Sequence, residues 1–475
     1  MITEPELEAL SPGEPGIRTN SLPGPRTRDV LDRLDGAEFS DGFEAGSPIA
    51  ISGGQGIYYE DHDGNRFMDL NIMVSLAYLG MGHPAVNERA GQYVRAFNRA
   101  GSPKSEIRAE LEERILAIAP HSMRDGRVLL TLTGTMANEI AVRMAMRATG
   151  RRRIVAFSNC YHGGWGVMWE IAGQARYRGY DWGDRTQTAT HIPFPNCYRC
   201  PYGRKPDDCG LACADFMEHL LAAPNTGVDD VACVIVEAVQ NSGHVPAPPG
   251  WMKRLRRICD RIGAMLVVDA LANGFVVSGD VFSHEAQGAD ADIVTIGKGI
   301  ANSMPLAAVI FSAEAAERAR GIAAYNGGNA HPVVMAAGVA TLDAMFDSKA
   351  DLMGRTKVLE SAARERLDPW AATSAVAGDL RIMGLTGCIE LVRDKESREP
   401  VASGLVEGTV LNTMLRSTES PGSLLLRGYP LSPLAQHGNV IRWCVPMTTP
   451  MAAYLRMIDA VTAAVDANAE ALGTR

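Results

Sequence analysis

Apolar residues are distributed along the chain in two alternating patterns, short unbroken runs and longer stretches with a helical period. The unbroken runs have strand length and lie at residues 128–134, 153–158, 231–239, 264–270 and 291–297. A strand in an open parallel sheet is covered by helices on both faces, so its residues are apolar throughout rather than alternately apolar and polar. The pattern therefore predicts an α/β fold around a mostly parallel sheet.

Stretches with a helical period accompany these runs. Residues 105–119, 136–148 and 251–263 each repeat apolar positions every three or four residues, which is typical of a helix with one buried face. The predicted inward residues are Ile107, Leu111 and Ile115 in the first helix and Trp251, Leu255, Ile258 and Ile262 in the last. Gly263 is expected to end the last helix, because glycine readily adopts the left-handed conformation found at helix ends.

The two ends of the chain differ from this central part. Two strand-like runs within residues 50–72 flank Asp63-Gly64, a strong turn signal, and predict a β-hairpin. After about residue 345 the pattern changes to longer helices and few strands. A chain of 475 residues is long enough for two domains. The expected segments are an extended N-terminal arm (1–27), the N-terminal part of a small domain (28–100), a large domain (101–345) and the C-terminal part of the small domain (346–475).

Composition and charge narrow the class of protein. The chain is 46% hydrophobic and 21% charged, with a formal net charge of -9. These values are typical of a globular protein and lack the basic excess of a nucleic-acid-binding one. No apolar run approaches the roughly 18 residues that span a bilayer, and the acidic start lacks the features of a secretory signal. We therefore expect no nucleic-acid partner, no membrane partner and a cytoplasmic location.

Candidate functional residues follow several of the predicted strands. Gly134-Thr135, Glu237, Asp269 and Lys298 each come at or just after the end of a strand. Ligands of open parallel sheets gather at the carboxyl ends of the strands. Taken singly, such a lysine is usually a surface residue and such an aspartate is often a helix cap. The combination of these residue types is what indicates a site.

These residue types suit a cofactor that stabilises carbanions. A protonated pyridine ring is an electron sink if a carboxylate such as Asp269 keeps the proton on its nitrogen. A desolvated amine such as Lys298 can form an imine with an aldehyde and later move a proton. A phosphate group requires backbone N–H groups at the start of a helix, which residues 133–139 (TGTMANE) provide. Tyr161 and Leu271 are candidates for the two faces of the ring.

Several segments resemble one known family in the same order along the chain. TGTMANEIAVRMA resembles its phosphate loop, NCYHGG (159–164) its ring-stacking segment, and DIVTIGKGIANSMPLAAV its Schiff-base lysine segment. Over about residues 20–470 the sequence resembles the class III (ω-type) aminotransferases. These form a branch of the fold-type I pyridoxal-phosphate enzymes that includes glutamate-1-semialdehyde aminomutase. The resemblance implies a seven-stranded-type central sheet, a smaller α+β domain built from both termini, and a homodimer with active sites at the subunit boundary.

The resemblance also implies roles for individual residues. Lys298 would carry pyridoxal 5'-phosphate as a Schiff base and act as acid and base, and Asp269 would pair with the pyridine nitrogen. Arg442 resembles the arginine that binds a substrate carboxylate, although a structural ion pair is the alternative. Trp165 would line the substrate pocket, or else pack in the core. The implied cofactor-binding residues are Gly134, Thr135, Met136, Tyr161, Glu237, Asp269, Leu271 and Lys298.

The sequence departs from the family pattern near the expected ring. The usual Asp-Glu-Val-Gln is Asp269-Ala270-Leu271-Ala272, so the glutamate and the glutamine are both lost. The usual Glu-Pro is Glu237-Ala238, and the threonine that reaches the partner's phosphate aligns near Asn326 or Gly327. These changes spare the groups that make the cofactor reactive and alter those that select the substrate and the reaction.

Three functions are consistent with these residues. The first is an aminotransferase that moves an amino group between an amine or amino acid and an oxo acid or aldehyde. The second is a pyridoxal-phosphate aminomutase, epimerase or decarboxylase, because the same cofactor chemistry leads to each. The third is a binding protein that kept the fold, although the retained Lys298 and Asp269 argue against it.

Four of the nine cysteines cluster within a short segment. Cys197, Cys200, Cys209 and Cys213 have the spacing C-x2-C-x8-C-x3-C. Four thiols so close together could bind zinc tetrahedrally. The alternative is a loop of reduced thiols packed by tyrosines, and no metal is counted among the expected site residues. The other five cysteines lie in apolar or helical segments and are expected to be buried and reduced.

Overall fold

The computed structural model describes residues 2–38, 49–70, 76–96, 104–173, 189–321, 329, 331–417, 422–423 and 438–473. The chain divides into two compact units. The first, here the large unit, is built mainly from Ala85–Phe346. The second, here the split unit, combines Met1–Pro84 with Asp347–Gly428 and His437–Arg475.

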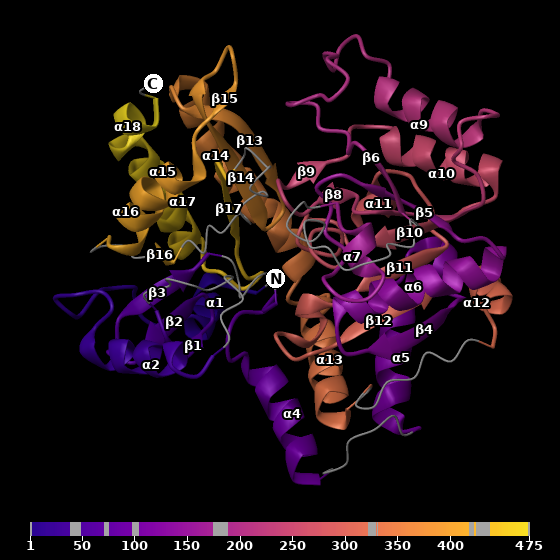
Figure 1. Ribbon diagram of the computed structural model, residues 1–475. Helices are drawn as coiled ribbons and strands as arrows, with labels where there is room; N and C mark the ends of the chain where they lie inside the picture. The colour runs from indigo at the N-terminus through magenta and orange to yellow at the C-terminus, as the bar shows by residue number, and fades with distance from the viewer. Residues whose placement is uncertain are drawn as a thin grey trace. The chain divides into compact units, whose positions relative to one another are not determined.

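A seven-stranded sheet forms the centre of the large unit (Figure 1). Its strand order is β4-β12-β11-β10-β7-β5-β6. Strand β12 is antiparallel to both of its neighbours, and the other described pairs are parallel. The strands are β4 (Arg127–Thr131), β5 (Arg153–Phe157), β6 (Ala189–Ile192), β7 (Val231–Val236), β10 (Met265–Asp269), β11 (Ile293–Ile296) and β12 (Ala307–Phe311). The predicted α/β fold with a mostly parallel sheet is confirmed.

Helices cover both faces of this sheet, as unbroken apolar strands require. Alternate strand residues point to opposite faces, and Cys233, Val267 and Val309 share one buried cluster with residues of helix α6 (Gly134–Thr149). On the other face Phe157 packs against Trp251 of helix α10 (Trp251–Ile262), with ring centroids 5.3 Å apart. Apolar residues are therefore buried on both sides of the strands.

The predicted helices are found close to their expected limits. Helix α5 (Glu106–Ile118) buries Ile107, Leu111 and Ile115 as expected. In α10 the expected inward residues are buried except Ile262, which is half-buried near the helix end. Gly263 ends α10 with a φ of 68°, the left-handed conformation that glycine adopts without steric cost.

The remaining elements of the large unit are shorter or peripheral. They are α4 (Pro84–Ala96), η1 (His121–Met123), α7 (Met168–Ile171), α9 (Ala212–Ala222), β8 (Val239–Gln240), β9 (Val245–Pro246), α11 (Ser283–Ala286), η2 (Lys298–Ala301), α12 (Ala313–Arg318) and α13 (Pro332–Met345). Strands β6 and β12 were not among the apolar runs identified from the sequence. Three of the four residues of β6 are only half-buried, so its pattern carries little signal.

The split unit contains two small sheets. The predicted hairpin is formed by antiparallel β2 (Tyr58–Asp61) and β3 (Arg66–Asp69), and Gly64 in its turn has a φ of 80°. That sheet also contains β1 (Ile51–Gln55) and β16 (Gly422–Ser423). The second sheet contains β13 (Ala377–Met383), β14 (Thr386–Asp394), β15 (Glu399–Pro400) and β17 (Val440–Cys444). The helices of the split unit that follow residue 346 are α14 (Leu352–Thr373), α15 (Ser403–Val406), η3 (Glu407–Leu411), α16 (Asn412–Leu415), α17 (Met451–Ala467) and α18 (Ala469–Gly473).

The N-terminal segment differs from the extended arm expected over residues 1–27. It contains helix α1 (Glu4–Leu10) and the start of helix α2 (Pro25–Asp35). A capping box between Thr3 and Glu6 satisfies the N–H groups at the start of α1. The Asp63 carboxylate accepts the N–H groups of Arg26 and Thr27 in the first turn of α2. The interpretation as an arm missed both helices because the prolines mark helix starts here, a position that proline tolerates.

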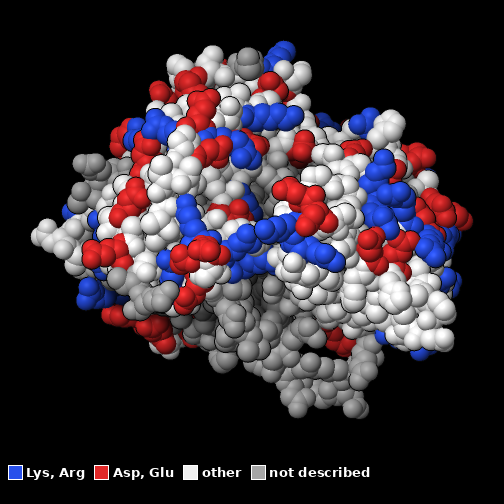
Figure 2. Space-filling model, turned by 90° about the horizontal axis from the view of Figure 1, so that it is seen from above, with Lys and Arg blue, Asp and Glu red and all other residues white. Residues whose placement is uncertain are grey.

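Positively and negatively charged side chains are both present on the surface. On the face seen in Figure 2, acidic and basic side chains are intermingled. Ion pairs account for part of this mixture, for example Arg254 of α10 with Asp215 and Glu218 of α9. Among the described residues, no helix combines the length and the apolar character needed to cross a membrane.

Candidate active site

Two candidate residues lie at the same edge of the central sheet. Asp269 is the last residue of β10 and pairs in register with Thr295 of the parallel neighbour β11. Lys298 begins the short helix η2, directly after Gly297 and the end of β11. Lys298 has a φ of 52°, a left-handed conformation that costs energy in a residue with a Cβ. The carboxyl ends of two adjacent strands therefore carry the acid and the amine.

The carboxylate of Asp269 is buried and fixed by three hydrogen-bond donors. Its Oδ2 is 2.8 Å from Nδ1 of His162 and accepts a bond of 2.7 Å from Nδ2 of Asn138. Its Oδ1 accepts a 3.0 Å bond from the N–H of Leu271. A carboxylate has about four acceptor positions, so one remains. The side chain is 2% exposed. The remaining acceptor position is therefore suited to an N–H donor that is itself buried.

Asn138 organises the surroundings of this carboxylate. It lies in α6, is fully buried, and also donates 2.8 Å to the backbone carbonyl of His162. Its Oδ1 accepts a 2.7 Å bond from the hydroxyl of Thr295 on β11. The sequence interpretation did not identify Asn138. The available signal was a polar residue on the otherwise apolar buried face of this helix.

His162 lies in the segment NCYHGG (159–164), which resembles the ring-stacking segment of the family. The structure shows that its Nδ1 lies at Asp269 while its buried Nε2 has no hydrogen-bond partner. His162 therefore joins two segments of the site, because it follows Tyr161 directly and contacts Asp269.

The start of α6 has the features of a phosphate-binding turn. Thr133 caps the helix, and its hydroxyl accepts the N–H of Met136 at 3.3 Å. A Cβ added to Gly134 would lie 2.7 Å from Cδ1 of Leu271, and one added to Gly297 would lie 2.7 Å from Cδ2 of the same side chain. A side chain at either position would have to displace the end of Leu271, and the expected phosphate turn, ring-facing residue and lysine segment meet at this leucine.

Glu237 lies next to this group, just beyond the end of β7. Its Oε2 accepts the N–H of Tyr161 at 3.2 Å and its Oε1 accepts the N–H of Asn241 at 3.3 Å. Burial, followed by repulsion from Asp269, raises the pKa of Glu237 to about 7, although His162 and the N–H of Tyr161 act in the opposite direction. Its protonation is therefore sensitive to pH near neutrality. Asn138, His162, Glu237 and Asp269 are called the carboxyl-edge network below.

Tyr161, Trp165 and Arg442, which were also predicted as site residues, differ in how far they are buried. Tyr161 is half-buried, so a face of its ring can remain available to a ligand. Trp165 is 79% exposed, so the alternative that it packs in the core is wrong, and its substrate role stays a prediction. Arg442 lies on β17 in the split unit, opposite Cys388 of β14, and is 8% exposed. Its role toward a substrate also stays a prediction. Asn326 and Gly327 lie outside the described residues.

The donor set fits pyridoxal phosphate. The ring nitrogen requires a fixed buried carboxylate, the aldehyde requires an amine, and the phosphate requires a helix start. The large unit provides all three, with Asp269, Lys298 and Gly134 linked through Leu271. Fold and site together define a pyridoxal-phosphate enzyme of fold type I.

Comparison with known proteins agrees with this class. The model of the family "Aminotransferase class-III" matches residues 43–419, so the chain belongs to the class-III aminotransferases. It is accordingly an enzyme that transfers amino groups and uses pyridoxal 5'-phosphate.

Individual relatives cover most of the chain. The diaminobutyrate–2-oxoglutarate aminotransferase of Rhizobium meliloti (strain 1021) is 28% identical over 443 residues, 90% of this chain and 89% of that protein. The leucine/methionine racemase of Thermococcus litoralis is 27% identical over 346 residues, 71% of this chain and 72% of that protein. The solved structure of taurine:2-oxoglutarate aminotransferase from Bifidobacterium kashiwanohense, in complex with PLP and glutamate, matches with a TM-score of 0.81. It is 22% identical and covers 94% of this chain and 99% of that chain, so it shows the fold alone.

Proposed function

We propose that amino-group transfer takes place at the carboxyl edge of the central sheet, with Lys298 as the amine that holds the cofactor. The substrates are an amine or amino acid and an oxo acid or aldehyde. When bound, pyridoxal phosphate supplies an aldehyde that captures the amino group and a ring that withdraws electrons. The observation that carries the proposal is the meeting of the Asp269, Gly134 and Gly297–Lys298 segments at Leu271.

The role proposed for Asp269 is to keep a proton on the ring nitrogen. A carboxylate beside a protonated nitrogen favours the charged form, and the effect is stronger where water is excluded. His162 and Asn138 hold Oδ2 while the N–H of Leu271 holds Oδ1. The carboxylate is therefore fixed before a ligand arrives, and no reorganisation is needed during the reaction.

The role proposed for Lys298 is to move a proton at the substrate carbon that bears the amino group. Its place at the start of η2 follows from the tight packing of Gly297 against Leu271 and Ala307. A side chain at position 297 would press on Leu271 and Ala307, so the glycine lets the backbone before the lysine pass close to both residues. Positioning of this kind is a large part of enzymatic rate enhancement.

Thr135, Met136 and Gly134 are proposed to hold the phosphate through backbone N–H groups of the first turn of α6. The positive end of the helix dipole adds to the attraction for an anion. Tyr161 is proposed to lie on one face of the ring and Leu271 on the other. Glu237 holds the Tyr161 backbone in place through the N–H bond of 3.2 Å.

Substrate recognition is proposed to involve Arg442 and Trp165. A buried guanidinium forms paired hydrogen bonds with a carboxylate, and several relatives are named for acidic or amino-acid substrates. We further propose that the enzyme is a cytoplasmic homodimer. The support for the dimer is the family resemblance, and an oligomeric-state measurement in solution would test it.

A second candidate is racemisation of an amino acid. It is supported by two racemases among the relatives, each 27% identical to this chain, and by Ala272 in place of the family's glutamine. Both reactions begin by removing the same proton from the substrate, and they differ in where a proton returns.

A single-turnover experiment separates the two reactions. The purified enzyme is mixed with one amine donor at a time, without an oxo-acid acceptor, while absorbance and products are followed. Aminotransfer converts the cofactor to its pyridoxamine form and releases one equivalent of oxo product. An enantiomer formed over many turnovers without acceptor, and without that conversion, would contradict aminotransfer and favour the racemase.

A further inference from the structure

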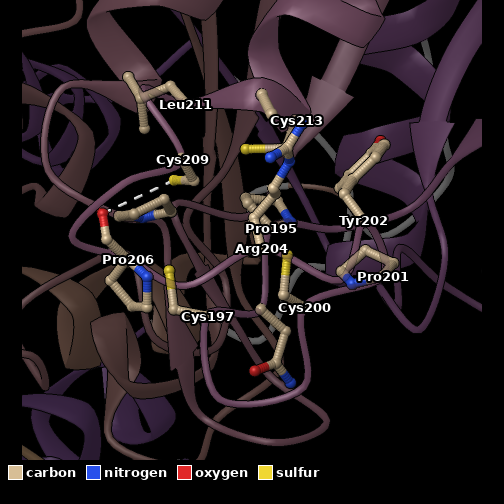
Figure 3. Close-up of a pocket in the computed structure, with 13 residues that line it drawn as sticks. Pro195, Cys197, Cys200, Pro201, Tyr202, Arg204, Pro206, Cys209, Leu211 and Cys213 are labelled. Carbon is tan, nitrogen blue, oxygen red and sulfur yellow. Dashed lines mark hydrogen bonds between the residues drawn. The ribbon is translucent and has the colours of Figure 1, made fainter.

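The large unit holds two clusters of polar or reactive side chains. The four clustered cysteines line a small pocket between β6 and α9 (Figure 3). Among the described residues, no group of three or more His, Cys, Asp or Glu side chains is placed to hold a metal ion, and these four sulfurs are included in that finding. The second cluster is the hydrogen-bonded group around Asn138, and its bonds reach the strand that leads to the proposed lysine.

Asn138 joins three separate segments through one buried amide group. Its Nδ2 donates to Oδ2 of Asp269 at 2.7 Å and to the backbone carbonyl of His162 at 2.8 Å. Its Oδ1 accepts the hydroxyl of Thr295 at 2.7 Å. An amide nitrogen has two N–H donors, so both are used. Because the side chain is 0% exposed, solvent cannot replace a partner that is lost.

These partners decide which way round the amide lies. An ionised carboxylate and a backbone carbonyl can only accept hydrogen bonds, so the side of the amide that faces Asp269 and His162 must be the nitrogen. The opposite orientation would bring Oδ1 against two acceptors. The Thr295 hydroxyl can donate to Oδ1 on the other side. The observed orientation is therefore the one in which every group of the cluster has a suitable partner.

Thr295 connects this amide to the strand that precedes Lys298. It lies in β11 and is fully buried. Its backbone pairs in register with Asp269 on β10, and its carbonyl accepts the N–H of Ala270 at 3.0 Å. The strand of the acid and the strand of the lysine are thus joined twice, once through the backbone and once through the side chain of Asn138.

The two oxygens of Asp269 have different numbers of partners. In the described part of the chain, Oδ2 is bonded to Nδ2 of Asn138 and Nδ1 of His162. Oδ1 is bonded to the N–H of Leu271 alone. Each carboxylate oxygen offers about two acceptor positions, so the remaining position is on Oδ1. Asn138 contributes to this difference, because without its N–H donor Oδ2 would have a position to spare as well.

We propose that Asn138 and Thr295 are positioning residues that direct the ring nitrogen of the cofactor to Oδ1 of Asp269. This rests on the proposed function, in which pyridoxal phosphate binds at this edge of the sheet. Thr295 orients the amide of Asn138, and the amide occupies Oδ2. Oδ1 is then the oxygen that receives the N–H of the ring. Both residues act through Asp269, so neither is a catalytic residue.

Protonation of the ring nitrogen in the holoenzyme tests the proposal. Apoenzyme is loaded with pyridoxal phosphate that carries an NMR-active isotope at this nitrogen, and its chemical shift, the Kd of the cofactor and the thermal midpoint are measured. Thr295→Val removes the hydroxyl at nearly constant shape. The ring nitrogen should become less protonated, and the cofactor should bind roughly 10-fold more weakly, as expected for one lost buried hydrogen bond.

Two further threonine variants serve as controls. Thr295→Ser keeps the hydroxyl, so it should keep the wild-type chemical shift and affinity. Thr131→Val is the matched control, because Thr131 is a fully buried threonine of β4 in the same sheet. Its hydroxyl has no hydrogen-bond partner among the described residues. This variant should leave the ring-nitrogen signal and the Kd unchanged.

Asn138→Asp should have a larger effect. It keeps the shape of the side chain but places a second carboxyl group beside Oδ2 of Asp269, and two such groups cannot both be ionised. The ring-nitrogen signal should move toward the unprotonated form over a wide pH range, and kcat should fall about 100-fold with little change in KM. Since Thr295 acts through Asn138, adding Thr295→Val to Asn138→Ala should change the signal no further.

A purely structural role gives a different result. The variants would then unfold at lower temperature, while the ring-nitrogen signal and the Kd of the folded protein stay at wild-type values, and this outcome overturns the proposal. An unchanged signal in Thr295→Val, or additive effects in the double variant, also overturns it. Thr295→Val alone decides the matter if the Asn138 variants do not fold.

The proposed function is tested separately by Lys298→Ala. If that variant loses turnover while the Asn138 and Thr295 variants keep the wild-type signal, only the positioning role is refuted. A wild-type protein that binds no pyridoxal phosphate would refute the proposed function and the positioning role together.

Discussion

The carboxyl-edge network and the pocket lined by Cys197, Cys200, Cys209 and Cys213, here called the cysteine pocket, are both clusters of chemically active side chains. They differ in how far apart in the chain their residues lie. The network joins residues that are far apart in the chain, such as Asn138 and Asp269, which are separated by 131 positions. The cysteine pocket draws its thiols from residues 197–213 alone. All four network residues are at most 2% exposed, whereas Cys197 is exposed and the other three thiols are half-buried.

This difference determines how strongly the residues affect one another. In the network Asn138 and His162 both bind the carboxylate of Asp269, and burial together with the charge of Asp269 raises the pKa of Glu237. Electrostatic effects of this size occur where water is excluded. In the cysteine pocket the shape depends on local turns. A change in the network should therefore alter catalysis and pH behaviour together, whereas a change in the pocket should alter only local stability.

Removal of the proposed amine should have the largest effect. Lys298→Ala should lose the absorbance band of the bound cofactor and reduce turnover by more than about 1,000-fold, because no other amine takes over the proton transfer. Turnover and the visible spectrum are measured together. Lys253→Ala, at an exposed position of α10, should behave as wild type. Wild-type rates in Lys298→Ala would refute the assignment of the site.

Neutralising the buried acid should have the next largest effect. Asp269→Asn keeps the size of the side chain but removes the charge that favours a protonated ring nitrogen, so kcat should fall by about 100- to 1,000-fold. Steady-state kinetics and cofactor affinity are measured. The control is Asp290→Asn, an exposed position between β10 and β11. If kcat in Asp269→Asn stays within a few-fold of wild type, the carboxylate does not support the ring.

Glu237 should make stability depend on pH. Its folded pKa of about 7 lies above its ordinary value of 4.5, first because of burial and then because of Asp269. Such a raised pKa contributes to the free energy of unfolding. The contribution is complete below pH 4.5 and is lost as the pH rises through about 7. The shift corresponds to roughly 3 kcal/mol. The titratable groups that shift the pKa of Glu237 are Asp269, His162 and Cys160.

The variant Glu237→Gln tests this pH dependence of stability. The free energy of unfolding of this variant, compared with that of wild type, should improve steadily as the pH is raised from 5 to 8. Glu365→Gln, at an exposed position of α14, should show no such trend. A constant difference between Glu237→Gln and wild type would mean that Glu237 is ionised throughout this range.

The smallest effect is expected in the cysteine segment. Gly203 has a φ of 65°, and an added Cβ would meet nothing within 4 Å. Gly203→Ala should therefore cost only the strain of a left-handed residue, about 1 kcal/mol. Gly404→Ala, where an added Cβ also meets nothing and the φ is not positive, should not be destabilised. Thermal unfolding measures both, and a change in turnover in Gly203→Ala would show that the two regions are coupled.

Much of the fold follows from periodicity in the sequence. The runs at 128–134, 153–158, 231–239, 264–270 and 291–297 lie on β4, β5, β7, β10 and β11. Two strands were missed. Strand β6 is mostly half-buried and carries little pattern, whereas β12 is a short apolar run inside the segment that was interpreted only as the lysine segment. Helices α1 and α2 near the N-terminus were also missed, and the Asp63 carboxylate at the start of α2 comes from a hairpin distant in the sequence.

The candidate site could be predicted only in part. The rule that ligands gather at the carboxyl ends of parallel strands was enough to select Asp269 and Lys298. It could not identify Asn138 as the residue that holds both Asp269 and Thr295. It also left Trp165 ambiguous between a pocket and the core, and only its 79% exposure excludes the core.

The sequence by itself therefore determined most of the central strands and helices, the hairpin turn, the cysteine spacing and the residue types available for chemistry, because these depend on neighbours within a few positions. The tertiary structure decided which donors fix the Asp269 carboxylate and that Glu237 titrates near neutral pH. It also decided that Leu271 lies against Gly134 at the start of α6 and Gly297 at the start of η2. Hydrogen bonds, burial and electrostatic repulsion act over a few ångströms in space, and only folding brings residues more than a hundred positions apart within that range.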